Sequence, residues 1–357
     1  MKRRTFLGMS AAALASSAFP NVIVPNQKKS IGVALLGLGS YSTYQLAPAL
    51  QMTNYCQLSG IITGSPEKIP VWQQKYSIPD RNVYSYENMH EISKNDEIDV
   101  IYVVTPTSTH MDFVIKAAEA GKHVWCEKPM AMTADECQKM IDVCNKNGVK
   151  LMIGYRMLHE PNTITLNSYA SSLPFGKINN INSAAGYNGG GGTDWRFKKT
   201  MGGGALYDMG VYTINGIRNA LQQEPVEVIS AKQYADRPEL FKEVDETTEF
   251  ELLFPDGIKA TGKTSVGQNI NHLKVDCEKG WYEMKPMQPY NGVKGSRSDG
   301  VQLNEYIENQ QAKQMDDDAL AILKDKPILA NASQGLQDIR VVQAVIKAAE
   351  TGRSVKM

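Results

Sequence analysis

Short apolar runs alternate with helix-like stretches over the first half of the chain. Each run ends near glycine or a polar cluster, as the buried strands of a parallel sheet do. Helical stretches are expected at 42–52, 110–120 and 133–147, the last opened by a Thr133–Glu136 capping-box sequence. Repeated β-α units predict a doubly wound parallel sheet, an α/β Rossmann domain over residues 31–154. The expected strands are 31–36, 58–63, 100–104, 123–126 and 150–153.

The pattern changes after Gly154, where consecutive strand-like segments are joined by turns. Residues 248–253 alternate between polar and apolar side chains, and Pro255-Asp256-Gly257 follows as a hairpin turn. Such segments predict an α+β domain over residues 155–357 with a large, mostly antiparallel open sheet. Helices are expected near 203–221, 303–323 and 334–351. The expected strands are 178–186, 226–235, 247–254, 258–265 and 272–276.

Composition removes several classes of function. Among 357 residues, 38 Lys and Arg balance 38 Asp and Glu, so nothing favours a nucleic acid or an anionic membrane as partner. The five cysteines follow no regular spacing, and the five histidines form no metal-binding motif. We therefore expect neither a disulfide framework nor a metal site.

The first residues resemble an export signal. Lys2, Arg3 and Arg4 precede Phe6-Leu7 and a weakly apolar run rich in Ala and Ser. Residues 1–22 are interpreted as a twin-arginine-type signal peptide, which exports folded proteins; the alternative is an ordinary secretory signal with two fortuitous arginines. Residues 23–30 are a linker or arm, and the expected location is the periplasm.

A glycine turn after the first strand predicts a dinucleotide site. In Gly37-Leu38-Gly39-Ser40-Tyr41-Ser42, the first glycine permits the turn and the second admits a pyrophosphate to the helix N-terminus. Ser42 replaces the usual third glycine. The alternative is a tight turn without a ligand.

The end of the second strand carries hydroxyls and a cation, in Thr63-Gly64-Ser65 and Lys68, rather than an acid. Glu67 is expected to point outward. These groups suit a ribose 2′-phosphate, so NADP is favoured over NAD. The alternative is that Lys68 is an ordinary solvated residue.

The candidate reacting groups are Lys128, Asp208 and Tyr212. Lys128 lies in Glu127-Lys128-Pro129, at the ligand-binding edge of the sheet, where an ammonium would stabilise a developing oxyanion. Glu127 is expected to pair with a cation. Asp208 and Tyr212 share a helical face, and a neighbouring ammonium would help Tyr212 act as a general acid/base. The alternative is a structural hydrogen bond at each position.

Several longer motifs carry a family resemblance. They include Gly121-Lys-His-Val124, Cys126-Glu-Lys-Pro-Met-Ala131, Ile153-Gly-Tyr-Arg156, Trp195-Arg196, Gly202–Tyr212 and Gly335-Leu-Gln-Asp338. With these motifs the chain resembles the Gfo/Idh/MocA oxidoreductase superfamily, and within it the glucose-fructose oxidoreductase subgroup, over nearly everything after Ile31.

The resemblance implies roles for named residues. It implies catalysis by Lys128 and Tyr212, with Asp208 acting beside them. Substrate contacts are expected from Lys128, Tyr155, Arg156, Asp208 and Tyr212. Cofactor contacts are expected from Gly37, Gly39, Ser40, Tyr41, Thr63, Gly64, Ser65, Lys68, Thr105, Pro106, His110, Glu127, Lys128, Arg156, Trp195 and Arg196.

The resemblance further implies NADP retained through ping-pong turnover and a homodimer or homotetramer formed through the C-terminal sheet. The chain departs from the pattern in its short arm, in the glycine-rich 186–194 segment and in residues 276–303. The leading hypothesis is an exported NADP-dependent sugar oxidoreductase acting at a sugar carbon, C1 of an aldose being favoured. The alternatives are an NAD-dependent glycosidase that acts by transient C3 oxidation and elimination, and a non-catalytic cofactor-binding sensor.

Overall fold

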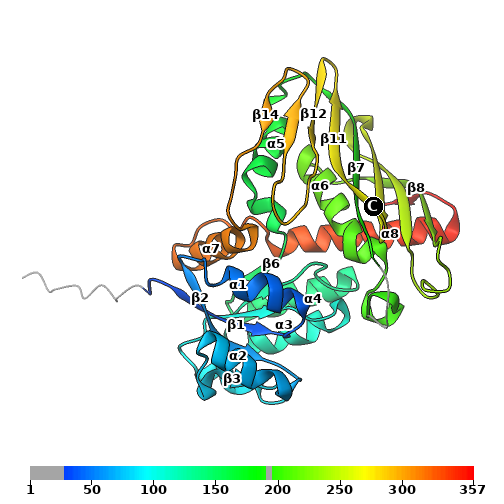
Figure 1. The fold of residues 1–357 in the computed structure, drawn as a ribbon. Coiled ribbons are helices and arrows are strands. Elements are labelled where there is room, and N and C mark those ends of the chain that lie inside the picture. Colours follow the sequence, from blue (N-terminus) through cyan, green and yellow to red (C-terminus); the bar gives the residue numbers. More distant parts are fainter. Residues whose placement is uncertain (1–27, 190–194) are drawn as a thin grey trace, which may run out of the picture.

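Two sheets, each with its own helices, make up the protein (Figure 1). The structure is a computed structural model that describes residues 28–189 and 195–357. The expected signal peptide, most of the linker and part of the glycine-rich patch lie outside the described residues. Lys28 pairs with Asp99 at 2.7 Å and thereby fixes the start of the described chain beside the amino-terminal end of the first sheet.

The first sheet has six parallel strands in the order β3-β2-β1-β4-β5-β6. This is the doubly wound order of dinucleotide-binding domains, in which ligands bind where the strand order reverses, here between β1 and β4. The prediction of a Rossmann sheet is confirmed. Its strands are β1 (Ile31–Leu36), β2 (Cys56–Ile62), β3 (Val83–Tyr84), β4 (Val100–Val103), β5 (His123–Cys126) and β6 (Leu151–Ile153).

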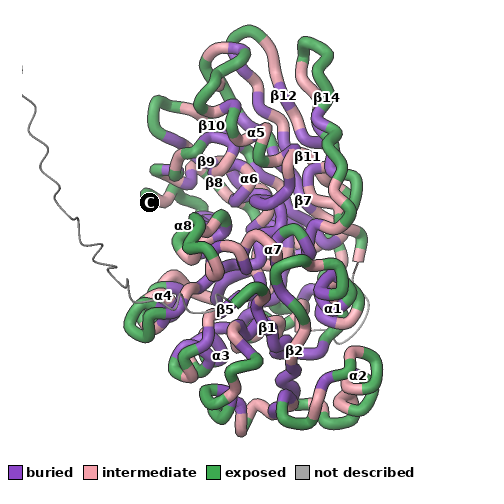
Figure 2. The backbone as a smooth tube through the Cα atoms, turned by 90° about the vertical axis from the view of Figure 1, so that its left-hand side faces the viewer, coloured by how far each residue is buried: buried purple, intermediate pink, exposed green. Residues whose placement is uncertain are grey.

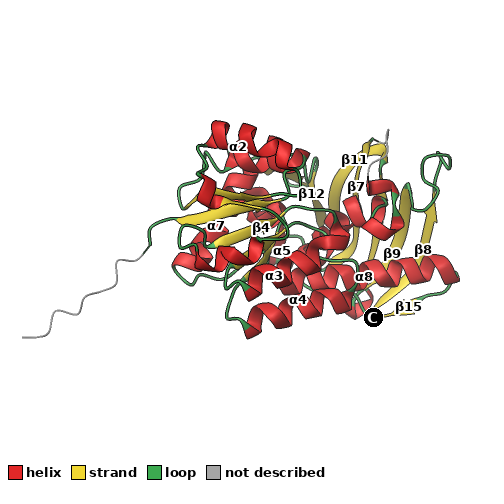
Figure 3. Cartoon of the chain, turned by 90° about the horizontal axis from the view of Figure 1, so that it is seen from below, coloured by secondary structure: helices red, strands yellow, loops and turns green. Residues whose placement is uncertain are grey.

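Helices cover both faces of this sheet, but one of them comes from the far end of the chain (Figure 3). On one face, α3 (His110–Glu119) and α4 (Ala134–Lys146) form a core with the strands. On the other face lie α1 (Ala47–Ala49), α2 (Ile69–Tyr76) and α7 (Gln310–Leu323), whose Met315 is fully buried among the strand side chains. The core of the N-terminal domain therefore includes residues beyond 154.

The second sheet has nine strands in the order β14-β13-β12-β11-β7-β10-β9-β8-β15. It is mostly antiparallel, as predicted, with one parallel pair between β7 and β10. Its strands are β7 (Ile178–Asn188), β8 (Glu227–Tyr234), β9 (Thr247–Leu253), β10 (Lys259–Ser265), β11 (Gly267–Cys277), β12 (Gly280–Met284), β13 (Gly295–Arg297), β14 (Gln302–Leu303) and β15 (Val355–Lys356).

One face of the second sheet is covered and the other is open. Helices α5 (Pro161–Ser172), α6 (Val211–Leu221) and α8 (Ala332–Thr351) pack on the covered face, where buried residues concentrate (Figure 2). The open face carries cross-strand ion pairs, among them Lys259 with Glu251 at 3.2 Å and Lys263 with Glu249 at 3.0 Å. A polar ladder of this kind leaves the face compatible with water.

Three predicted helix boundaries are wrong. The helix expected from 303 begins at Gln310, because Asn309 caps it and residues 302–303 pair with β13. The helix expected from 203 opens with a π-helical turn at Leu206–Gly210, because Gly202 and Gly204 have positive φ. The helix expected over 42–52 is a π-helical turn, Ser42–Leu46, followed by the short α1. The Thr133–Glu136 capping box and the turn at 255–257 are confirmed.

The described residues add two findings on excluded classes. None of their helices is both long and apolar enough to cross a membrane. They also contain no group of three acidic, histidine or cysteine side chains placed to hold a metal. All five cysteines are buried and free.

Candidate active site

The glycine turn after β1 has the geometry of a pyrophosphate cradle. Gly37 has φ +96°, and a side chain there would collide with the Val104 carbonyl at the end of β4. Gly39 has no heavy atom within 4 Å of the place a Cβ would take, so the outer face of the turn is open. The hydroxyl of Ser42 donates to the Gly37 carbonyl at 2.6 Å, which accounts for serine in place of a third glycine. These residues fit a bound dinucleotide.

The end of β2 brings its polar groups beside this turn. Lys68 Nζ donates to the Leu38 carbonyl at 2.9 Å, so its ammonium lies next to the glycine turn rather than in open solvent. The hydroxyl of Thr63 accepts from the Ser65 amide at 3.0 Å. Glu67 is exposed, as expected. Hydroxyls and a cation without a carboxylate facing them fit a 2′-phosphate.

Lys128 reaches across from the first domain to the second. The Lys128–Pro129 peptide is cis, and Lys128 Nζ donates to the backbone carbonyl of Asp208 at 2.8 Å and lies 3.4 Å from its Oδ1. The ammonium also lies 4.7 Å from the centroid of the Tyr212 ring. The three predicted reacting residues are thus brought together.

Burial and neighbouring charges act in opposite directions on the pKa values of Lys128 and Asp208. Burial opposes the charge of Lys128, but Tyr212, Asp208 and Glu127 outweigh it and raise its pKa. Burial likewise opposes the charge of Asp208, but Lys128 and Arg196 hold its pKa below the ordinary value. Both groups are therefore charged at neutral pH although their side chains are only 13% and 12% exposed.

Asp208 is shared by two further side chains. Tyr187, at the end of β7, donates its hydroxyl to Oδ2 at 2.9 Å, and Arg196 Nε lies 3.4 Å from the same oxygen. The Arg196 guanidinium lies 4.6 Å from the Trp195 ring centroid. Trp195 and Arg196 were predicted to contact cofactor; the structure brings Arg196 to Asp208. Sequence reasoning missed Tyr187, whose only signal was its place in the divergent 186–194 segment.

Glu127 is held by a hydroxyl rather than by a cation. Its buried carboxylate accepts from the Tyr102 hydroxyl at 2.6 Å and forms no ion pair with any described residue. The predicted cation pairing is therefore wrong, because the adjacent Lys128 points instead to Asp208. Burial raises the pKa of Glu127 to about 7, although Tyr102 and Lys128 oppose the shift.

Tyr155 and Arg156 lie behind the reacting groups. Tyr155 is fully buried and meets the Tyr212 ring edge-on, with centroids 6.5 Å apart. Arg156 is 2% exposed, and its guanidinium donates to the carbonyls of Gln288 and Pro289 and to the side chain of Gln310. Both side chains are therefore buried behind Tyr212 and contact its ring, rather than lying exposed to a substrate or cofactor.

The loop after β4 is fixed by a buried histidine. His110 contacts the Thr105 carbonyl at 2.8 Å through Nε2 and the Pro129 carbonyl at 2.9 Å through Nδ1. Burial lowers its pKa. His110 thus joins the loop containing Thr105 and Pro106 to the segment that carries Lys128. The structure gives this predicted cofactor residue a positioning role.

The turn that carries Asp208 is held by a carboxylate that sequence reasoning did not identify. Asp245 accepts from the Leu206 amide at 2.9 Å and fills the space beside Gly204, where any side chain would collide with it. Tyr207 donates to the Met132 carbonyl at 2.6 Å and so joins this turn to the first domain. The backbone that positions Lys128 is therefore fixed from both sides.

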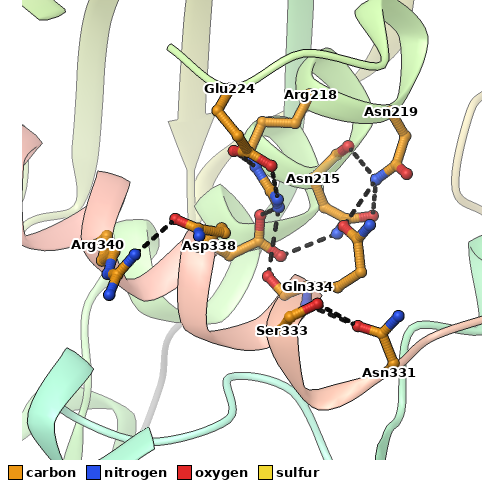
Figure 4. A network of polar contacts seen from close by, with 10 residues as sticks. Asn215, Arg218, Asn219, Glu224, Asn331, Ser333, Gln334, Asp338 and Arg340 are labelled. Carbon is orange, nitrogen blue, oxygen red and sulfur yellow. Dashed lines mark hydrogen bonds and ion pairs between the residues drawn. The ribbon is translucent and has the colours of Figure 1, made fainter. Parts of the chain in front are cut away.

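A buried ionic network holds α6, the helix of Tyr212, against α8 (Figure 4). Arg218 pairs with Asp338, and its Nε donates to Glu224 at 2.6 Å. Asn215 donates to the other Asp338 oxygen at 2.8 Å. The motif that ends at Asp338 is one of those that carry the family resemblance. In the structure, Asp338 fixes α6 through Arg218 and Asn215.

Comparison with known proteins agrees with this architecture. Residues 31–155 match a family described as an oxidoreductase family with an NAD-binding Rossmann fold, and residues 167–283 match the GFO/IDH/MocA C-terminal domain. A crystal structure of aldose-aldose oxidoreductase from Caulobacter crescentus, complexed with glycerol, is 35% identical, with a TM-score of 0.88 over 92% of this chain and 100% of that one.

Two curated relatives act on polyols or sugars. D-xylose 1-dehydrogenase [NADP(+)] of Haloarcula marismortui is 27% identical over 91% of this chain and 92% of its own length. The scyllo-inositol 2-dehydrogenase (NADP(+)) IolW of Bacillus subtilis is 28% identical over 52% of this chain and 50% of its own. The names of both relatives specify NADP as the cofactor.

Proposed function

The chain belongs to the Gfo/Idh/MocA oxidoreductase family, and from this premise we propose that it is an NADP-dependent sugar oxidoreductase acting at C1 of an aldose. The observation that carries the proposal is the meeting of Lys128, Asp208 and Tyr212 at the ligand-binding edge of a Rossmann sheet. The glycine turn and Lys68 on the same edge supply a place for the cofactor.

The reaction removes two hydrogens from a carbinol. The glycine turn and Lys68 would hold NADP⁺, which would supply the hydride acceptor for the sugar carbon. Tyr212 takes the hydroxyl proton, and the Lys128 ammonium stabilises the negative charge that develops on the oxygen. The backbone carbonyl of Asp208 holds the Lys128 ammonium in place, and its carboxylate, contacted by Tyr187 and Arg196, helps to keep Lys128 charged.

NADP is preferred to NAD because of the residues at the end of β2. Lys68 beside the glycine turn would meet a 2′-phosphate, and the exposed Glu67 does not face that position. The NADP-dependent relatives support the same choice.

Retention of the cofactor, export and self-association are further parts of the proposal. The chain is exported to the periplasm by its twin-arginine-type signal and alternates between two sugar substrates on a retained cofactor. Two or four copies associate through the nine-stranded sheet in a closed symmetric arrangement.

The test is an absorbance trace near 340 nm on purified protein, with aldoses added first without cofactor. A rise that a ketose or lactone reverses supports bound nicotinamide and ping-pong turnover. A rise only after NADP is added supports a dissociable dehydrogenase. If aldoses give no signal and a glycoside does, the elimination mechanism of the glycosidases replaces the proposal.

A further inference from the structure

Tyr290 is an exposed aromatic residue beside the reacting groups. It lies in the loop between β12 and β13, within the 276–303 region noted above for its departure from the family pattern. Tyr290 is 45% exposed, and the Arg156 guanidinium that lies 5.6 Å from the Tyr212 ring centroid also lies 5.0 Å from the Tyr290 ring centroid. The ring of Tyr41, which follows the glycine turn, is 6.3 Å away at an interplanar angle of 31°. Tyr290 therefore stands at the mouth of the site, between the two domains.

The loop under Tyr290 is fixed by buried groups. Arg156 Nη2 donates to the Gln288 carbonyl at 2.6 Å, and Nη1 donates to the Pro289 carbonyl at 3.2 Å. Gln310 donates to the Pro289 carbonyl at 3.0 Å. Asn271 accepts from the Gln288 amide at 3.0 Å. An exposed ring on so firmly held a backbone is preorganised for a ligand, because little conformational entropy is lost on binding.

Arg156 also supports the ring itself. Its guanidinium lies 5.0 Å from the Tyr290 ring centroid and 5.6 Å from that of Tyr212. A cation near a tyrosine ring is attracted to it and holds it in place. Arg156 therefore contacts both the exposed Tyr290 ring and the Tyr212 ring.

The chemistry of the ring selects its ligand. The face of a tyrosine ring is apolar, and its hydroxyl is polar. Such a ring suits a ligand ring that is apolar on one face and hydroxylated at its rim, such as a pyranose. The Arg156 guanidinium beside the ring disfavours a positively charged ligand on it, whereas a neutral sugar meets no such repulsion.

We propose that Tyr290 is a platform on which the ring of a cyclic aldose or aldoside packs, and that it selects cyclic over acyclic substrates. The platform refines the proposed sugar specificity. Its effect on turnover rests on the proposed function, whereas its effect on sugar binding does not. Arg156 acts as a positioning residue for the platform.

The experiment measures binding of methyl α-D-glucopyranoside to the NADP-loaded protein by calorimetry, because this probe cannot be oxidised as a free aldose. Tyr290→Leu should weaken binding at least tenfold, while Tyr290→Phe should stay within about threefold of the wild type. Tyr306→Leu is the matched control, since Tyr306 is 76% exposed and lies outside this cluster. Glycerol binding and NADP affinity should be unchanged in Tyr290→Leu.

Each other outcome has a definite meaning. Equal glucopyranoside binding by the wild type and Tyr290→Leu, or no binding by either, overturns the platform, as does a loss of NADP affinity without a loss of sugar affinity. Binding of the glycoside with the expected Tyr290 dependence, but without oxidation of any aldose by the wild type, supports the platform and overturns the proposed function.

Discussion

Lys128 is held by the backbone carbonyl of Asp208, 2.8 Å from its Nζ, more closely than by the Asp208 carboxylate, whose Oδ1 is 3.4 Å away. The position of the ammonium is therefore set by the path of the chain at Leu206–Gly210, and the carboxylate is one of the groups that raise the pKa of the lysine. The two contributions can be separated by mutation.

Lys128→Met should lower turnover about 10³-fold, because it removes the charge that stabilises the developing oxyanion. Asp208→Asn should cost less, about 10- to 50-fold, since the backbone carbonyl still holds the lysine. Steady-state kinetics with a saturating aldose and NADP checks both. Equal losses in the two variants would show that the carboxylate acts on the substrate itself.

Tyr212→Phe should lower turnover about 10²- to 10⁴-fold, because it removes the proton acceptor and leaves the ring. The contacts of the ring with Lys128 and Tyr155 remain, so the melting temperature should be unchanged. Kinetics and thermal unfolding on one preparation make the comparison. Tyr44→Phe, at an exposed position, is the control, and full activity of Tyr212→Phe would remove this tyrosine from the reaction.

Lys68→Ala should weaken NADP binding about 10- to 100-fold and leave NAD binding nearly unchanged, because only NADP carries the 2′-phosphate. Titration of cofactor-free protein by nucleotide fluorescence measures both affinities. Lys75→Ala, an exposed lysine on the same helical segment, should bind both cofactors like the wild type. A parallel loss for NAD and NADP would place Lys68 at the pyrophosphate instead.

Arg218→Leu should destabilise the protein by about 3–5 kcal/mol, because it leaves the Asp338 carboxylate buried without its cation. Chemical denaturation gives the free energy of unfolding. Arg340→Ala provides the control on α8, since Arg340 is exposed and donates to the side chain of Gln337 at 3.3 Å, and should stay within about 0.5 kcal/mol. A loss below about 1 kcal/mol for Arg218→Leu would mean that the network is dispensable.

Asp318 gives a prediction for pH dependence. Its carboxylate is buried, has no hydrogen-bond partner in the described part of the chain, and lies 3.9 Å from His159. Burial raises its pKa to about 7, so the folded state holds a proton that the unfolded state releases. Stability relative to Asp318→Asn should therefore fall as pH rises from about 4 to 7, by roughly 4 kcal/mol in all, and level off above.

Unfolding free energies of wild type and Asp318→Asn at pH 4.5, 6 and 8 check this sign. Asp112→Asn, at an exposed position on α3, should track the wild type throughout. A gain in wild-type stability relative to Asp318→Asn with rising pH would reverse the assignment.

Local sequence was enough to predict the groups whose geometry is local. Gly37 needs its positive φ whatever lies around it, and the strand before Lys128 brings that residue to the ligand-binding edge of any parallel sheet. The family motifs then added Asp208 and Tyr212 to Lys128 as residues of the site. The prediction for Glu127 was wrong because its partner, Tyr102, lies on the neighbouring strand β4. The register between β4 and β5 brings the two residues together.

The residues that were missed share one cause. Tyr187 enters the site from the end of β7 and Tyr290 from the loop between β12 and β13, and their approach depends on packing between domains that no local pattern records. The predicted contacts of Arg156 with cofactor and substrate stay a prediction, and its hydrogen bonds to Gln288 and Pro289 could not be predicted because these residues lie far along the chain.

The position of α7 has a consequence for synthesis of the protein. Met315 and its neighbours on α7 cover one face of the N-terminal sheet, so a nascent chain that has just left the ribosome with all six strands still exposes that apolar face to water. We therefore expect the N-terminal domain to complete its fold only after α7 has been translated, so that a transport machinery that accepts only finished proteins would receive both domains folded or neither.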